Sequence, residues 1–162
     1  MAVAEIIGAA IGVLLLVVVA YILVGSTLTT AEVVVAAQND LTLQHEQRLR
    51  TSLTITSEIP PDDFAFNFSV KNTGSEIISN FAHMDILTSD GAELGYTAYT
   101  YQKEGMPGPG YWSVTRIEND YLHPNSLDPG ESMWCMVTFS GNPPIWFQVT
   151  TANGVSASAY LI

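Results

Sequence analysis

The chain has 162 residues, sixteen of them acidic and five basic, which gives a formal net charge of -11 and leaves room for one globular domain with an appendage. From Ser52 onward twelve acidic residues stand against three basic ones, a net charge of -9, so nucleic acid and anionic lipid headgroups are poor partners. The single cysteine, Cys135, excludes an intramolecular disulfide.

The first element is an apolar segment, Ile6 to Val24, with no charged residue over its nineteen positions. About 20 apolar residues in a helix, at roughly 1.5 Å each, cross the ~30 Å hydrocarbon core of a bilayer. A cleaved secretory signal would begin with basic residues, and none precedes this segment, so we expect a retained transmembrane helix. The positive-inside rule leaves its orientation open, because Arg48 and Arg50 lie too far from the span.

The helix is predicted to continue beyond the membrane, because no glycine or proline occurs between Ser26 and Ile59. We therefore divide the chain into a transmembrane and assembly helix, residues 1–50, and a β-domain, residues 51–162. A helix that outreaches the bilayer cannot bury its outer half against one small domain, so we expect copies of the chain to self-associate along it. The candidate assembly residues are Glu5 and three members of an apolar stripe with helical spacing, Val34, Leu41 and Leu49.

Glu5 has two interpretations, because a carboxylate at the edge of an apolar helix is costly unless it is paired or reaches the interface. In type IV pilin-like subunits, a glutamate at this place pairs with the N-terminal amine of a neighbouring copy during assembly. Alternatively, the side chain extends to the membrane surface on its own.

The β-domain is indicated by short alternating runs separated by turn residues. Alternation is strict in 64–71, where Phe64, Phe66, Phe68 and Val70 alternate with more polar residues. Strands at roughly even spacing with turn signals between them predict an antiparallel β-sandwich of immunoglobulin-like kind, and the fold class is mainly β. The expected strands are 51–57, 64–71, 81–88, 96–101, 111–118, 132–140, 145–151 and 155–161.

A segment rich in glycine and proline, 102–110, is predicted to be a long loop, and long loops in compact domains are often functional. Met106 in this loop, with Tyr111 and Trp112 after it, offers an apolar contact surface. We expect Trp112 and Tyr121 to be the aromatic residues least committed to the inner face of a strand. These four residues are the candidate interface, with flexible filler and buried aromatics as the alternatives.

A possible glycosylation site is Asn67, which begins the sequon Asn67-Phe68-Ser69 inside a predicted strand. This sequon is one ground for expecting the β-domain outside the cytoplasmic membrane.

No motif for catalysis or for a cofactor is present, and the histidines are scattered along the chain. Cys135 lies among apolar residues, which is typical of a small buried hydrophobe. Carboxylates at Asp62–Asp63 with Glu58, and at 118–120, could offer oxygens to Ca²⁺, but neither group has an EF-hand pattern, and a solvated acidic turn is the favoured interpretation. We expect no enzyme, no catalytic residue, no cofactor and no metal site.

Several short segments resemble the FlaG/FlaF family of archaellum proteins, and the resemblance extends over nearly the whole chain. The segments are 48–55, 70–74, 110–114, 116–121 and 127–131. The resemblance implies a membrane protein with an immunoglobulin-like sandwich outside the cytoplasmic membrane. It further implies assembly with sister stator proteins and contact with the S-layer, as the static part against which the archaellum turns. The N-terminus is also similar to those of archaellins and adhesive pilins, whose helices form a filament core.

The leading hypothesis is therefore a structural component of the archaellum, a self-associating stator or scaffold anchored in the cytoplasmic membrane of an archaeal cell envelope, with its C-terminal domain outside. Its expected partners are further copies of itself, archaellum stator or filament proteins, and the S-layer protein. The alternative is an archaellin- or pilin-like subunit of an extracellular filament. A third hypothesis is a Ca²⁺- or glycan-binding surface domain.

Overall fold

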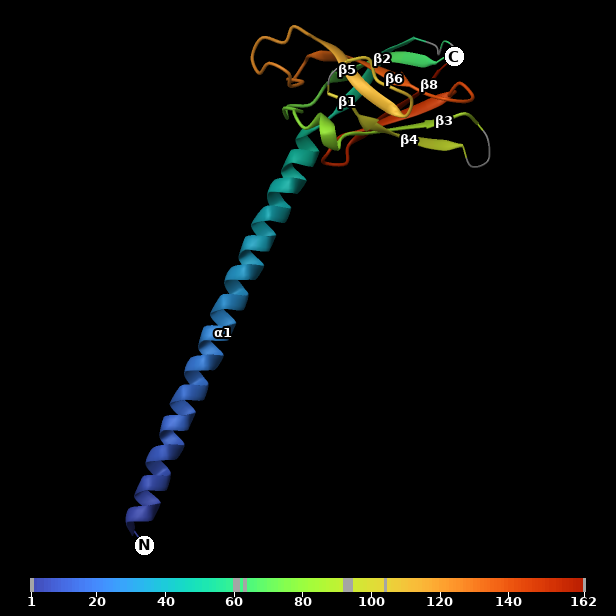
Figure 1. Ribbon diagram of the computed structural model, residues 1–162. Coiled ribbons are helices and arrows are strands. Elements are labelled where there is room, and N and C mark those ends of the chain that lie inside the picture. Colours follow the sequence, from blue (N-terminus) through green and yellow to red (C-terminus); the bar gives the residue numbers. More distant parts are fainter. Residues whose placement is uncertain (1, 60–61, 63, 92–94, 104, 162) are drawn as a thin grey trace. The chain divides into compact units, whose positions relative to one another are not determined.

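The computed structural model describes residues 2–59, 62, 64–91, 95–103 and 105–161. Within these residues one long helix precedes eight strands and one short 3₁₀ helix (Figure 1). The chain divides into two compact units after Gln44, so the last turn of the helix belongs with the strands. The elements are α1 (Ala2–Arg50), β1 (Leu53–Ile59), β2 (Ala65–Asn72), η1 (Phe81–His83), β3 (Asp85–Ser89), β4 (Tyr96–Tyr101), β5 (Tyr111–Glu118), β6 (Ser132–Thr138), β7 (Trp146–Thr150) and β8 (Ser156–Tyr160).

The α1 helix is continuous through both its apolar and its polar part, as predicted. After the apolar segment, hydroxyl side chains such as those of Thr27 and Thr30 donate to carbonyl oxygens three or four residues earlier, which keeps these polar residues within the helix. The apolar side chains between Ile6 and Val24 are exposed, with Tyr21 at 80%. By length and composition, α1 is able to cross a membrane.

The strands form two four-stranded halves, β1-β2-β6-β5 and β4-β3-β7-β8, joined where β5 meets β4. Six strand pairs are antiparallel. The β4–β5 pair is parallel and short, joining Thr100 to Tyr111 and Tyr101 to Trp112, which departs from the fully antiparallel expectation. The mainly β sandwich after a long helix is thus confirmed, with one parallel contact that closes it.

The predicted loop 102–110 explains the parallel contact, because it returns the chain to the end of β4. The Gln102 side chain holds this loop: Nε2 donates to the Met106 carbonyl oxygen at 3.2 Å, and Oε1 accepts from the Gly108 N–H at 3.4 Å. Hydrogen bonds from the Gln102 side chain therefore hold the two ends of this loop close together.

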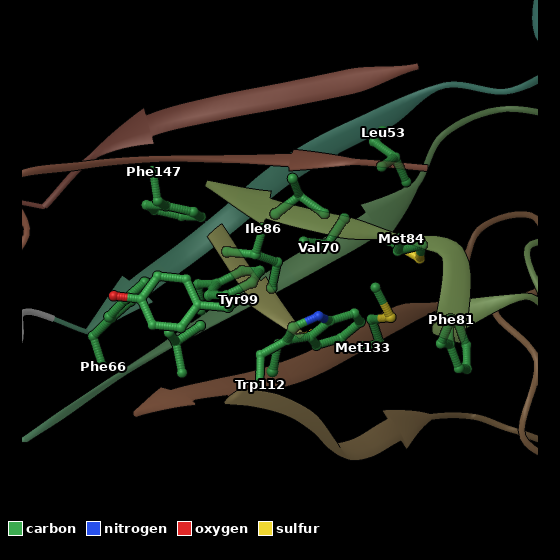
Figure 2. Close-up of a cluster of buried hydrophobic side chains, with 14 of the residues drawn as sticks. Leu53, Phe66, Val70, Phe81, Met84, Ile86, Tyr99, Trp112, Met133 and Phe147 are labelled. Atoms are coloured by element: carbon green, nitrogen blue, oxygen red, sulfur yellow. The ribbon is translucent and has the colours of Figure 1, made fainter. Parts of the chain in front are cut away.

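The core lies between the two halves, and Figure 2 shows side chains from both of them meeting there. Phe147 from β7 lies against Phe68 from β2, with ring centroids 4.6 Å apart. Inward and outward residues alternate along β2 and β6, as the sequence pattern predicts. The fully buried aromatic side chains are Phe66, Phe68, Trp112 and Phe147.

Two expected strands begin two or more residues later than predicted. The segment 81–88 starts as η1, where the Asn80 Oδ1 and His83 Nδ1 atoms lie 2.8 Å apart and favour a local turn, so β3 begins only at Asp85. The first strand begins at Leu53, because Thr51 still belongs to the helix end: both its N–H and its hydroxyl donate to the Gln47 carbonyl oxygen.

Candidate functional site

The last turn of α1 is bonded into the β-domain by the loop that follows β2. The terminal carbonyl groups of a helix have no partner within the helix. Here the Arg50 carbonyl oxygen accepts hydrogen bonds from the N–H groups of Ser75, at 2.8 Å, and Glu76, at 3.3 Å. Two residues further along the chain, the Ser52 carbonyl oxygen accepts a hydrogen bond from the Thr73 N–H group at 2.9 Å. The 73–76 loop therefore caps the helix with main-chain atoms.

Gly74 allows this approach, because its Cα lies directly against the chain as it leaves the helix. A Cβ atom added at this position would collide with the Arg50 carbonyl oxygen and the Ser52 backbone nitrogen. Backbone atoms cannot move aside as a flexible side chain can, so the junction requires glycine here.

A second clamp is provided by the turn between β7 and β8. The Asn153 Nδ2 atom donates to the Thr51 hydroxyl at 2.7 Å. A guanidinium nitrogen of Arg48 lies 3.5 Å from the Gly154 carbonyl oxygen, a long hydrogen bond. Together, the two clamps join the last turn of α1 to loops on both halves of the sandwich.

The buried side chain of Asn72 connects the first clamp to the turn before β6. Its Nδ2 atom donates to the carbonyl oxygens of Glu76, at 2.8 Å, and Leu127, at 3.0 Å, and its Oδ1 accepts from the Gly74 N–H at 3.0 Å. All polar atoms of this buried amide are therefore satisfied. We call the hydrogen-bonded group Arg48, Arg50, Thr51, Asn72, Gly74, Asn153 and Gly154 the junction.

Sequence reasoning missed the junction as a site. Asn72-Thr73-Gly74 and Asn153-Gly154 indicate turns between strands, but their sequence does not show what those turns contact. The available signal was an asparagine followed closely by a glycine, as in Asn72 with Gly74 and in Asn153 with Gly154. An asparagine side chain can bond the backbone of its own turn. Three of the segments that carry the family resemblance, 48–55, 70–74 and 127–131, meet here.

The predicted assembly residues lie on α1 and are all exposed. Glu5 is in the first turn, and Val34, Leu41 and Leu49 lie further along the helix. Their role in assembly stays a prediction.

The predicted interface residues are not equivalent in the structure. Met106 and Tyr121 are 80% and 83% exposed, and Tyr111 is exposed at the start of β5. Trp112, in contrast, is fully buried, and Figure 2 shows its indole inside the core cluster. The expectation that Trp112 avoids the inner face is wrong, because consecutive residues of a strand point to opposite faces and Tyr111 points outward.

Asn67, the possible glycosylation site, lies in the middle of β2 and is partly exposed. It pairs with Ile59 of β1 on one side and with Met136 of β6 on the other. The outward side of the sheet is the only one open to a modification at this position, and glycosylation stays a prediction.

Two of the carboxylates considered as Ca²⁺ ligands, Asp62 and Glu118, accept hydrogen bonds from other groups of the β-domain. The Phe64 and Ala65 N–H groups donate to Asp62 and lower the pKa of its carboxyl group, while Asp63 lies outside the described residues. Glu118 accepts from the Arg116 guanidinium and the Trp134 indole. Among the described residues, no three His, Cys, Asp or Glu side chains are grouped so that they could hold a metal ion.

Cys135 lies in the core, and burial raises the pKa of its thiol. A thiol that stays protonated and inaccessible is neither a nucleophile nor a metal ligand. The interpretation of Cys135 as a small buried hydrophobe is confirmed.

Comparison with known proteins gives likenesses among solved structures only. No protein-family model and no curated protein matches the chain. The archaellum periplasmic stator protein FlaG from Sulfolobus acidocaldarius shares 21% identity at a TM-score of 0.49, over 67% of this chain and 97% of that one. The complex of the stator proteins FlaF and FlaG from the same organism gives 20% identity at a TM-score of 0.48, over 66% and 85% of the two chains. The chain is thus similar to archaellum stator proteins, and at these identities the similarity concerns the fold alone.

Proposed function

We propose that this protein is a membrane-anchored stator or scaffold of an archaeal motility apparatus. In this role α1 holds the chain in the cytoplasmic membrane, and the β-domain contacts the S-layer or a sister protein outside. The function is mechanical, so it requires attachment and rigidity rather than a catalytic site.

Anchoring is supported by the exposure of the apolar part of α1. The apolar side chains of this uncharged stretch of nineteen residues, Ile6 to Val24, are exposed on the helix. Exposed apolar surface of this extent is unfavourable in water and favourable in hydrocarbon.

The observation that carries the mechanical proposal is the junction. A flexible linker between an anchor and a domain would transmit little torque. Here the chain passes from helix to strand within two residues, and the helix end is bonded to the 73–76 loop and to Asn153. Force applied to the β-domain would therefore reach the end of α1 through several hydrogen bonds at once.

The assignment of this protein to a motility apparatus rests on the sequence resemblance to the FlaG/FlaF family. Two of the resembling segments, 48–55 and 70–74, contribute residues to the junction, and a third, 127–131, accepts a hydrogen bond from Asn72 through the Leu127 carbonyl oxygen. Copies of the chain are expected to associate along α1 through the stripe that contains Val34, Leu41 and Leu49.

A deletion strain tests the proposal. We expect cells without the gene to assemble archaellum filaments but not to swim, and expression of the full chain to restore swimming. Normal swimming of the deletion strain would contradict a stator role.

A filament subunit is the second candidate, favoured by the continuity of α1 beyond its apolar segment. Helices of this length could bundle in a filament core with the β-domains outside. Shearing the cells and measuring the protein in both fractions by mass spectrometry separates the candidates. Recovery in sheared filaments favours the subunit, and recovery in membranes favours the stator.

A further inference from the structure

A cleft of about 590 Å³ opens on the β-domain beside the end of β4. Its walls come from four parts of the chain: η1 with the residues before it, the end of β4, the middle of β5, and the turn that follows β5. The residues of the junction do not line it. Pockets that hold small ligands usually have volumes of roughly 300 to 1,000 Å³, so the cleft is large enough for a small molecule.

The cleft exists because β4 leaves β5 early. In the described residues, β4 pairs with β5 only at Tyr111 and Trp112, and the Gln102 N–H then donates to the Trp112 carbonyl oxygen. Beyond Trp112, this edge of β5 pairs with no strand in the described part of the chain. A β-bulge between Val114 and Arg116 disturbs β5 at the same place, and bulges are frequent next to functional sites.

One wall of the cleft is aromatic. The Tyr101 ring packs against those of Trp112 and Phe81, with centroids 4.9 Å and 6.3 Å away. Trp112 and Phe81 are buried, whereas Tyr101 is partly exposed, and both Tyr101 and Phe81 line the cleft. A tyrosine that the core holds in place and leaves partly open offers a ligand an apolar ring together with a hydroxyl group.

Charged groups of both signs line the rest of the cleft. They are Lys103 and Arg116, two of the three basic residues from Ser52 onward, and the acidic Asp120. The Arg116 guanidinium donates to Glu118 at 3.1 Å, so its charge is already paired. An anion in the cleft would be repelled by Asp120, and a bare cation would be repelled by Lys103 and Arg116. The lining therefore favours a neutral ligand that both donates and accepts hydrogen bonds.

The carboxyl group of Asp120 has one oxygen without a donor. Its Oδ2 atom accepts a hydrogen bond from the Asn125 N–H group at 2.9 Å, which closes the turn between these two residues. Its Oδ1 atom is buried and receives no hydrogen bond from the described residues. A buried polar atom without a partner is unfavourable, and a donor group brought by a ligand would satisfy it.

Asn80 and Lys103 supply donors in the same cleft. The Asn80 Oδ1 atom lies 2.8 Å from the His83 Nδ1 atom, so this oxygen is engaged and the amide nitrogen remains to donate. Lys103 is exposed, and no ion pair joins it to a carboxylate in the described part of the chain. The cleft thus combines a carboxylate acceptor, N–H donors and a partly exposed tyrosine ring.

We propose that this cleft binds a pyranose sugar. A hydroxyl group both donates and accepts, so one sugar hydroxyl can donate to Asp120 while others accept from Asn80 and Lys103. The C–H groups on one face of the sugar ring then pack on the Tyr101 ring. The same contacts serve a free sugar and a sugar residue of a glycan. The site does not depend on the proposed stator role.

Saturation-transfer NMR tests the site with the full chain in phosphatidylcholine nanodiscs, which carry no sugar headgroups. The probes are the methyl glycosides of glucose, mannose, galactose and N-acetylglucosamine. We expect at least one glycoside to receive saturation from the protein, and Ala82→Trp, which fills the cleft, to weaken its binding about five-fold or more. Ala98→Trp is the matched control and should bind normally, because Ala98 is an exposed alanine of β4 that does not line the cleft.

A second variant tests the carboxylate acceptor. Asp120→Asn should weaken binding of the same glycoside about five-fold or more, whereas Asp90→Asn should leave it unchanged. Asp90 is a matched control, because it is also a partly exposed carboxylate next to a strand that accepts a hydrogen bond from an asparagine, Asn142. The Tm of each variant shows whether it is folded, and Ala82→Trp decides the question if Asp120→Asn is not.

A trisaccharide of the bound sugar separates the two sources of the ligand. Tighter binding of the trisaccharide indicates a glycan and equal binding indicates a single sugar residue, and both results support the site. Absence of saturation transfer to all four glycosides, or binding unchanged in folded Ala82→Trp or Asp120→Asn, would overturn the inference. Binding of a tetraglutamate peptide without binding of any glycoside would also overturn it, since the cleft would then be a peptide site.

Discussion

The side-chain amide of Asn72, in β2, donates a hydrogen bond of 3.0 Å to the carbonyl oxygen of Leu127, 55 residues later. Both residues are fully buried. The same amide bonds the main chain of Glu76 and Gly74, next to the end of α1. One side chain thus fixes the 73–76 loop and the turn before β6 relative to each other, and through them the point at which the helix enters the domain.

Replacement of Asn72 by alanine should destabilise the β-domain strongly. It would leave the carbonyl oxygens of Glu76 and Leu127 and the Gly74 N–H buried without this partner, and each buried unsatisfied group costs about 1 to 3 kcal/mol. We expect a loss of about 3 kcal/mol or more in the free energy of unfolding. Denaturant unfolding measures it, with Asn67→Ala, an outward residue of the same strand, as the control. A loss below about 1 kcal/mol would mean that water replaces the amide.

Gly74→Ala should loosen the attachment of the helix end. The new Cβ would collide with main-chain atoms of Arg50 and Ser52, so the 73–76 loop must withdraw. We expect a lower Tm together with faster hydrogen exchange at the N–H groups of Ser75 and Glu76. Gly108→Ala is the matched control, because a Cβ there comes no nearer than 4.0 Å to Tyr111. Equal behaviour of the two variants would refute the requirement for glycine at position 74.

Trp112→Ala should be among the most destabilising substitutions in the chain. Removing a fully buried aromatic side chain leaves a cavity and costs about 3 to 5 kcal/mol. Tyr121→Ala, at 83% exposure, should change the free energy of unfolding by less than about 0.5 kcal/mol. Chemical denaturation of both variants checks the distinction, and a mild effect of Trp112→Ala would argue against its place in the core.

The thiol of Cys135 should be unreactive until the domain unfolds. Its burial excludes reagents and raises its pKa, so at pH 8 the folded protein has little thiolate at this position. Because the folded pKa is raised, stability is unaffected below the unfolded pKa and decreases as pH rises above about 8.5. A thiol-reactive dye should label the protein rapidly in guanidinium and very slowly without it. Fast labelling of the folded protein would contradict the burial.

The elements could be predicted from sequence because their patterns are local. The helix follows from an uncharged segment and from the absence of glycine and proline between Ser26 and Ile59. Strands such as β4 and β5 follow from alternation and from turn residues on either side. Hydrophobic periodicity and the residues that interrupt helices or strands act within a few positions, so a single sequence is enough to recognise them.

The remaining features depend on contacts between residues far apart in the chain. The parallel contact of β4 with β5 is set by how the 102–110 loop folds back, and alternation cannot give strand order. Trp112 is expected not to face inward, although its position within β5 turns it into the core. Similarly, Asn72 and Asn153 looked like turn residues, and only the fold brings them to the end of α1.

In the proposed stator role, the junction transmits force between the helix and the β-domain. A flexible insertion of Gly and Ser residues between Arg50 and Thr51 would leave the apolar helix and the β-domain intact but separate the helix end from the loops that bond it. The same insertion at the exposed Gly141 is the control. In the deletion strain, we predict that the chain with the insertion after Arg50 reaches the membrane at normal levels but does not restore swimming, while the control does. Full swimming with the insertion after Arg50 would contradict a mechanical role for the junction.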